Sequence, residues 1–225
     1  MNFNNLINRF YHNKFFSQLF HTTVYCLQRE LKDCESVLDI GCGPSSPLQY
    51  CQNIKYSVGV EPFNPYLYES KKKNIHTKYL NKKIEELNFP EKSFDAVIMV
   101  EVLEHLSKEL GYEILRKAEK WAIKKIIITT PNGYLHQKQL DKNMLQKHIS
   151  SWTKKDFKWQ NYKIFGLAGL KYLRKESENE SMNGDLLSPI KYSPRFFWFI
   201  VLTISQIFVY YFPGRSFELF CVKRV

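Results

Sequence analysis

The chain has 225 residues, of which 44% are hydrophobic and 24% charged, so it can bury one α/β core and is not a disordered protein. Its formal net charge of +11 points to phosphate-rich partners, either nucleic acid or an anionic membrane. Lysine is scattered along the whole sequence, however, which favours a solvated basic surface and makes nucleic acid the less favoured partner.

Taken in order, the chain begins with a mainly helical pattern over residues 1–35, where apolar side chains recur at helical spacing. Five short apolar runs then alternate with helical segments, which implies βαβ units and a mainly parallel sheet. The expected strands are 36–40, 57–61, 75–80, 94–99 and 124–130, and the expected helices between them are 45–52, 68–72 and 107–122.

After residue 130 the pattern becomes less regular. Pro131-Asn132-Gly133 ends the regular pattern, and a loop is expected to run to Gln146. Thr153 is the expected N-cap of a short helix. Two further strands are expected at 162–168 and 216–222. We therefore divide the chain into a core, 36–170, an insertion, 171–215, that carries a charged run and an apolar helix, and a last core strand, 216–225.

The cysteines form no C-x-x-C pair and no spacing typical of a metal site. We interpret them as reduced thiols and expect a cytoplasmic protein, because no apolar segment follows a basic start at the N-terminus. They are Cys26, Cys34, Cys42, Cys51 and Cys221.

The segment Val37–Gly43 is a short apolar strand that ends in two glycines flanking one residue. A strand, a glycine turn and a helix present backbone N–H groups to a nucleotide-like cofactor. Glu61 follows Gly41 by 20 residues, where a ribose-binding acid is expected. The pattern also fits a dinucleotide enzyme, but Asp39 inside the strand end and Ser46 in place of a third glycine favour another cofactor.

The same stretch resembles motif I of the class I S-adenosylmethionine (SAM) dependent methyltransferases, and the resemblance continues through 94–99 and 101–106. It implies a Rossmann-like fold with a mainly parallel seven-stranded sheet, an antiparallel last strand and helices on both faces. It also implies SAM as the cofactor and residues 1–35 as a helical cover over it, although a helix packed on the sheet edge is an equal alternative.

The resemblance implies a set of cofactor-binding residues. Glu61 is expected to accept hydrogen bonds from both ribose hydroxyls, and Ile84 to pack on the adenine. Lys83 stands where the family often has an aspartate for the adenine amine, which lysine cannot replace as an acceptor; Glu85 and Asn81 are the nearby substitutes. The full set is Asp39, Gly41, Cys42, Gly43, Glu61, Ile84 and Glu101.

The chemistry is expected just past the fourth strand, where Glu104 and His105 are the candidate catalytic residues together with His148 after the fifth strand. With Glu101, these residues could instead bind a divalent cation, as in the metal-dependent 2′-O-methyltransferases of small-RNA 3′ ends, which the spacing resembles. The ubiquinone-pathway O-methyltransferases share the Glu-x-x-Glu-His, and Glu-His here is widespread without a metal, so the favoured expectation is no metal.

The apolar run 196–212 has 17 residues and no charge, which is the lower limit for a membrane span. The strand 216–222 must return to the sheet, so we expect an amphipathic helix over the substrate mouth or in a membrane interface. A helix buried in the core or in a dimer interface is the alternative, and the oligomeric state stays open.

These features together predict a SAM-dependent methyltransferase that acts on an oxygen of a small lipid-like or glycan-like acceptor. One alternative is a metal-dependent RNA 3′-end 2′-O-methyltransferase. The other is a non-catalytic SAM-binding or membrane-associated interaction protein.

Overall fold

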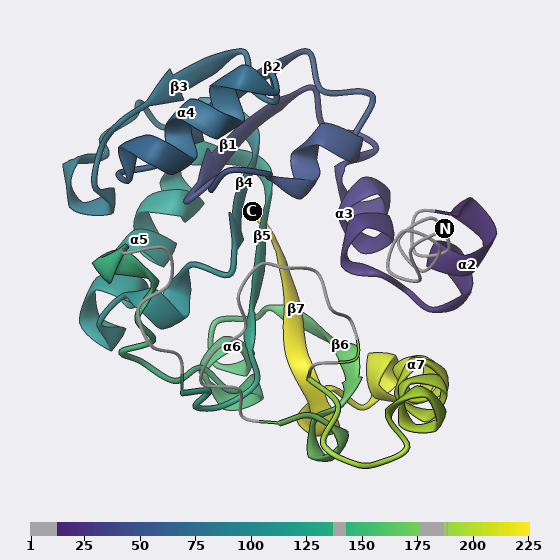
Figure 1. Cartoon of the computed structure of the whole chain (residues 1–225). Coiled ribbons are helices and arrows are strands. Elements are labelled where there is room, and N and C mark those ends of the chain that lie inside the picture. Colours follow the sequence, from purple (N-terminus) through teal and green to yellow (C-terminus); the bar gives the residue numbers. More distant parts are fainter. Residues whose placement is uncertain (1–12, 137–142, 176–186, 188) are drawn as a thin grey trace.

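Seven extended segments form one sheet in the order β3-β2-β1-β4-β5-β7-β6 (Figure 1). The computed structural model describes residues 13–136, 143–175, 187 and 189–225. The strands are β1 (Ser36–Ile40), β2 (Tyr56–Val60), β3 (Lys78–Leu80), β4 (Phe94–Val100), β5 (Ala122–Pro131), β6 (Lys163–Leu170) and β7 (Ser216–Arg224).

The first five strands pair in parallel, whereas β7 runs antiparallel between β5 and β6. This arrangement confirms the predicted mainly parallel sheet with an antiparallel last strand. The helices of the described residues are α2 (Lys14–Leu19), α3 (Thr23–Leu31), α4 (Asn64–Lys72), α5 (Lys108–Trp121), α6 (Lys154–Lys158) and α7 (Arg195–Tyr211).

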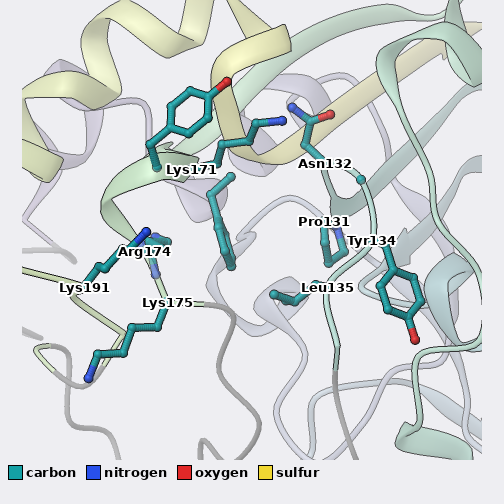
Figure 2. A pocket seen from close by; sticks show the side chains of 11 residues that line it. Pro131, Asn132, Tyr134, Leu135, Lys171, Arg174, Lys175 and Lys191 are labelled. Atoms are coloured by element: carbon teal, nitrogen blue, oxygen red, sulfur yellow. The ribbon is translucent and has the colours of Figure 1, made fainter.

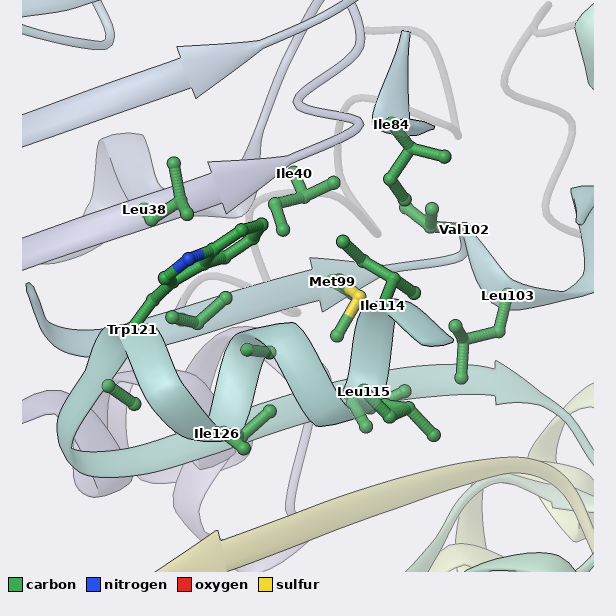
Figure 3. Close-up of a cluster of buried hydrophobic side chains, with 14 of the residues drawn as sticks. Leu38, Ile40, Ile84, Met99, Val102, Leu103, Ile114, Leu115, Trp121 and Ile126 are labelled. Carbon is green, nitrogen blue, oxygen red and sulfur yellow. The ribbon is translucent and has the colours of Figure 1, made fainter. Parts of the chain in front are cut away.

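Strand residues alternate between two hydrophobic cores, because successive side chains of a strand point to opposite faces. On one face Leu38, Met99 and Ile126 pack against Ile114 and Trp121 of α5, as Figure 3 shows. On the other face the intervening strand residues pack against α3 and the end of α7, with members that include Val37, Ile98, Ile127, Leu27, Leu31 and Tyr210. Both faces of the sheet are therefore covered by helices, as predicted.

Local sequence signals set several helix ends. Ser107 caps α5 through a hydrogen bond from the Leu110 N–H, and Thr153 forms a capping box with Asp156 at α6. α4 begins at Asn64, earlier than the predicted 68–72, because Pro65 fits the first turn of a helix, where its missing N–H costs nothing.

The predicted helix 45–52 is wrong. Only the 3₁₀ turn η1 (Pro47–Tyr50) forms there, and Cys51 is already extended. Beyond it, the Asn53 amide donates to the carbonyls of Leu31 and Cys34, 2.7 Å away in each case, which draws the chain back toward α3. The third strand is also shorter than the predicted 75–80, since it starts at Lys78.

The predicted apolar helix is α7, which packs along β6 at the edge of the sheet (Figure 1). Its polar side chains face the protein: Gln206 accepts from the Gly169 N–H at 2.8 Å and donates to the Gly166 carbonyl at 3.2 Å. Leu202 and Val209 are buried, but several other apolar side chains of the helix face outward, with Phe197 55% and Ile204 58% exposed. Within the described residues, no helix has the length and hydrophobicity needed to cross a membrane.

Candidate functional site

The glycine turn after β1 depends on backbone conformations that favour glycine. Gly41 has a φ of 71° and Gly43 a φ of 57°. A Cβ on Gly41 would lie 2.6 Å from Cγ2 of Val102, whereas the position of a Cβ on Gly43 is open. The turn therefore passes close to the end of β4 on one side and leaves space on the other.

The N–H groups of this turn are already used within the protein. Those of Gly41 and Cys42 donate to the Val60 carbonyl at 2.8 and 3.0 Å, and that of Gly43 donates to Oε2 of Glu61 at 3.1 Å. The expectation that this turn offers its N–H groups to a ligand is therefore not met. The turn lets a ligand approach the backbone closely at Gly43, where no side chain intervenes, beside the Glu61 carboxylate.

Asp39 is buried beneath the turn, where it holds the following segment in place. Its carboxylate accepts from the Ser46 hydroxyl at 2.5 Å and lies 3.4 Å from Nε2 of His76. Burial raises the pKa of Asp39 to about 7 and lowers the pKa of His76 to about 4. Because the Ser46 hydroxyl also accepts from the Leu48 N–H, Asp39 fixes the start of η1.

Glu61 follows β2 and connects two turns. Oε1 accepts from the Phe63 N–H at 2.9 Å while Oε2 accepts from Gly43, and burial raises the pKa of this carboxyl. The Asn81 amide donates to the backbone carbonyls of Glu61 and Pro62, so its role is to support this turn.

One cavity of about 460 Å³ lies at the carboxyl ends of β1, β2 and β4, where ligands bind in open α/β sheets. Every predicted cofactor residue lines it, namely Asp39, Gly41, Cys42, Gly43, Glu61, Ile84 and Glu101. Lys83 and Glu85 line it too, whereas Asn81 does not.

Some lining residues had no signal in the sequence. Asn143, Leu145 and Gln146 come from the irregular segment after β5 and include most of the 3₁₀ turn η4 (Met144–Gln146). No residue of α2 or α3 lines the cavity, and residues 1–12 lie outside the described part of the chain, so the expected helical cover stays a prediction.

Next to this cavity the structure brings together the three predicted catalytic residues, Glu104, His105 and His148, with one possible ligand atom from each within 4.8 Å of the others. Glu104 is 2% exposed, and burial, followed by the Glu101 carboxylate, raises its pKa well above the ordinary value. Its Oε2 accepts from the Thr130 hydroxyl at 3.0 Å, while Oε1 has no partner.

The two imidazoles are held by backbone carbonyls. Nδ1 of His148 lies 2.8 Å from the Leu135 carbonyl, and Nδ1 of His105 lies 3.2 Å from the Lys147 carbonyl. A carbonyl only accepts, so each Nδ1 carries the proton and each Nε2 keeps a lone pair. Burial lowers the pKa of His105 to about 4 and lowers that of His148, so both rings are neutral.

Glu101 and His105 connect this cluster to the cavity, because both line it. Glu101 has a φ of 54°, which is uncommon outside glycine, and its Oε1 accepts from the Thr129 hydroxyl at 2.8 Å. Backbone strain of this kind gathers at functional sites.

Comparison with known proteins agrees with this geometry. Residues 38–124 match a family model described as a methyltransferase domain. No curated protein sequence matches the chain. Many solved structures do, among them three that each cover 90% or more of this chain.

The first is a SAM-dependent methyltransferase from Archaeoglobus fulgidus, with 18% identity over 95% of this chain and 100% of that chain and a TM-score of 0.55. The second is the methyltransferase domain of bacterial CtHen1-CN, with 16% identity over 90% and 97% and a TM-score of 0.52. The third is the plantazolicin methyltransferase BpumL in complex with SAH, with 17% identity over 97% and 88% and a TM-score of 0.51.

At these identities the likeness to solved structures shows the fold, and the family match covers the strands that build the cavity. Motifs, fold and family match thus agree. The chain has the Rossmann-like fold of the class I SAM-dependent methyltransferases, and its residues 38–124 match the methyltransferase-domain family.

Proposed function

We propose that the cavity at β1, β2 and β4 binds SAM and that the chain transfers a methyl group to a hydroxyl of a small lipid-like or glycan-like acceptor. The observation that carries the proposal is the shared border: Glu101 and His105 line the cavity, and His105 also belongs to the cluster with Glu104 and His148. A methyl group bound in the cavity would thus face groups that can handle a proton.

SAM supplies a methyl group that is activated by a positively charged sulfur. The protein positions the acceptor in line with that methyl group, and proximity is a large part of the rate. A neutral imidazole can accept the hydroxyl proton at Nε2 as the new C–O bond forms, because Nδ1 of each ring already carries a proton. The raised pKa of Glu104 means that this carboxyl keeps a proton to higher pH than an ordinary glutamate does.

The test is turnover with methyl-labelled SAM against panels of hydroxyl-bearing lipids and glycans. We expect labelled product with one panel and a loss of at least about a hundredfold in His105→Ala or His148→Ala, the usual size of a general-base contribution. SAM affinity measured by calorimetry should persist in His148→Ala. Binding without product in any panel would favour the non-catalytic SAM-binding alternative.

A second candidate is metal-dependent transfer to the 2′-hydroxyl at an RNA 3′ end. The arrangement of the cluster favours the metal. Backbone carbonyls fix the Nδ1 protons of His105 and His148, which leaves both Nε2 lone pairs available. In addition, Oε1 of the buried Glu104 has no hydrogen-bond partner. This is the pattern of metal ligands with outer-shell support, and the residues present fit a divalent cation. Glu104, His105 and His148 would hold the ion, which would polarise the acceptor oxygen, whereas Glu101, the fourth ligand suggested by the sequence, lies outside this group.

Calorimetric titration with Mn²⁺ tests this candidate without an acceptor. We expect saturable binding that Glu104→Gln abolishes, whereas Glu109→Gln, on an exposed position of α5, leaves it unchanged. Full turnover in EDTA would exclude the metal, and turnover with small hydroxyl acceptors but not with RNA would exclude the RNA acceptor.

We also propose that the outer face of α7 rests in a membrane interface. One side of this helix exposes Phe197, Ile200 and Ile204, and Arg195 and Arg215 flank the helix, which matches anionic headgroups around an apolar surface. In flotation with anionic liposomes, Phe197→Glu with Ile200→Glu should release the protein. Wild-type protein that never floats would contradict membrane contact and leave a protein partner for this face.

A further inference from the structure

A second cavity, of about 580 Å³, lies beyond the end of β5, against the segment that follows β6 (Figure 2). In Figure 2, Arg174, Lys175 and Lys191 lie together on one side of the pocket, and Asn132 and Tyr134 lie on the other. Lys171 also lines it. We call it the basic pocket.

Short backbone contacts hold the basic side of the pocket. Arg174 and Ile190 form an antiparallel bridge, the Lys175 N–H donates to the Pro189 carbonyl at 2.8 Å, and the Lys191 N–H donates to the Leu173 carbonyl at 2.9 Å. Two chain segments are thus paired so that their lysines gather at one place.

The lysines of this pocket have no acidic partner among the described residues, whereas the charge of Arg174 interacts with the Glu218 carboxyl. No described carboxylate forms an ion pair with Lys171, Lys175 or Lys191. The Arg174 guanidinium is fixed, since its Nε donates to the Ala168 carbonyl at 2.9 Å and the group lies 4.8 Å from the centre of the Phe217 ring. Gathered cations raise the local potential, and a bound anion would relieve their repulsion.

The basic pocket adjoins the catalytic cluster. Leu135 lines the pocket, and its carbonyl is the one that holds Nδ1 of His148. Pro131 lines it as well and directly follows Thr130, whose hydroxyl donates to Glu104. A molecule anchored in this pocket would therefore lie next to the cluster.

We propose that the basic pocket binds a phosphate group of the methyl acceptor, an inference that rests on the proposed methyl transfer. Three ammonium groups and a guanidinium suit a group with several oxygens and more than one negative charge better than a single carboxylate. The exposed ring of Tyr134 supplies a flat apolar wall for the rest of the acceptor. The phosphate comes from a soluble phosphorylated molecule or from a lipid headgroup.

The test compares Lys175→Ala/Lys191→Ala with a control, Lys32→Ala/Lys158→Ala, that removes the same charge from exposed positions elsewhere. At fixed ionic strength we titrate inorganic phosphate, with acetate as a carboxylate probe, and measure cosedimentation with phosphatidylcholine vesicles with and without phosphatidic acid. The affinity for SAM is measured in the same samples.

We expect the affinity for phosphate to fall at least about tenfold in the pocket variant and less than twofold in the control. In the wild type, the affinity for phosphate should exceed the affinity for acetate. Pocket-dependent binding of phosphatidic acid vesicles assigns a lipid phosphate, and phosphate binding without vesicle binding assigns a soluble acceptor. Equal losses in both variants, or no phosphate binding while SAM still binds, would overturn the inference. Failure of the wild type to bind SAM would instead overturn the proposed function.

Discussion

Replacing Glu61 tests the cofactor cavity most directly, because this carboxylate has two tasks that separate experimentally. It accepts from the N–H groups of Gly43 and Phe63, and it lines the cavity where ribose hydroxyls are expected. Glu61→Ala removes both tasks. Glu61→Gln keeps the volume and one acceptor oxygen but places an NH₂ group against one of the two N–H donors.

The magnitudes follow from hydrogen-bond energetics. Two N–H groups that lose their acceptor cost about 1 to 3 kcal/mol each, and water that enters the open cavity keeps the loss of stability near 2 kcal/mol. Two hydrogen bonds from ribose hydroxyls to a charged group are worth about 1.5 to 3 kcal/mol each before water compensates. SAM affinity should therefore fall by more than about tenfold, which is about 1.4 kcal/mol.

The assay combines calorimetric titration of SAM with urea unfolding of the free protein. Glu91→Ala is the matched control, because it removes the same charge from a side chain that is 71% exposed and outside the cavity. We expect Glu61→Gln to lose affinity with less loss of stability than Glu61→Ala. An unchanged dissociation constant in Glu61→Ala would refute the assignment of the cavity to SAM.

Three further outcomes are expected in urea unfolding. The pKa of Asp39 in the folded protein is about 7, against an ordinary 3.8, so ionisation of this carboxyl disfavours the fold. As the pH rises from 4 to 7, the free energy of unfolding of the wild type should fall by up to about 4 kcal/mol relative to that of Asp39→Asn. A difference between the two proteins that stays constant with pH would contradict this. Gly111→Ala should destabilise the protein by about 1 to 2 kcal/mol, because a Cβ would lie 2.4 Å from the buried Trp152 ring and the strain of this contact exceeds the gain in helix propensity. Equal stability of variant and wild type would mean that the ring moves. Gln206→Leu should cost about 2 kcal/mol by leaving two β6 backbone groups unpaired, and no loss would show that they find other partners.

Local patterns predicted the sheet well. β1 and β4 are short apolar runs bounded by turn residues, and the cap Thr153 is read from residue type alone. The helix predicted after Gly43 failed because its outcome depends on distant partners, namely the Asn53 amide and the carbonyls of Leu31 and Cys34.

The candidate site likewise has some residues that the sequence reveals and others that only the fold reveals. Glu61 and Glu101, which sequence reasoning selected from their place after a strand, line the cavity. The segment 143–146 on its border has no periodicity, so only the fold reveals it. The carbonyls that set the imidazole tautomers come from Leu135 and Lys147, and a backbone group leaves no trace in residue types.

The spacing of polar residues on α7 shows why periodicity needs the fold to be interpreted. Thr203, Gln206 and Tyr210 form a stripe, and a polar stripe on an apolar helix is ordinarily expected to face water. Here Gln206 is buried because β6 departs from regular pairing near Gly169 and leaves a backbone group that needs a partner. Tyr210 is also buried, and its hydroxyl accepts from Arg29 at 2.6 Å. Once the polar face is used inside the protein, the apolar face is left outside. An exposed apolar surface that the fold itself creates needs a lipid or protein partner, and the basic residues at both ends of the helix favour an anionic one.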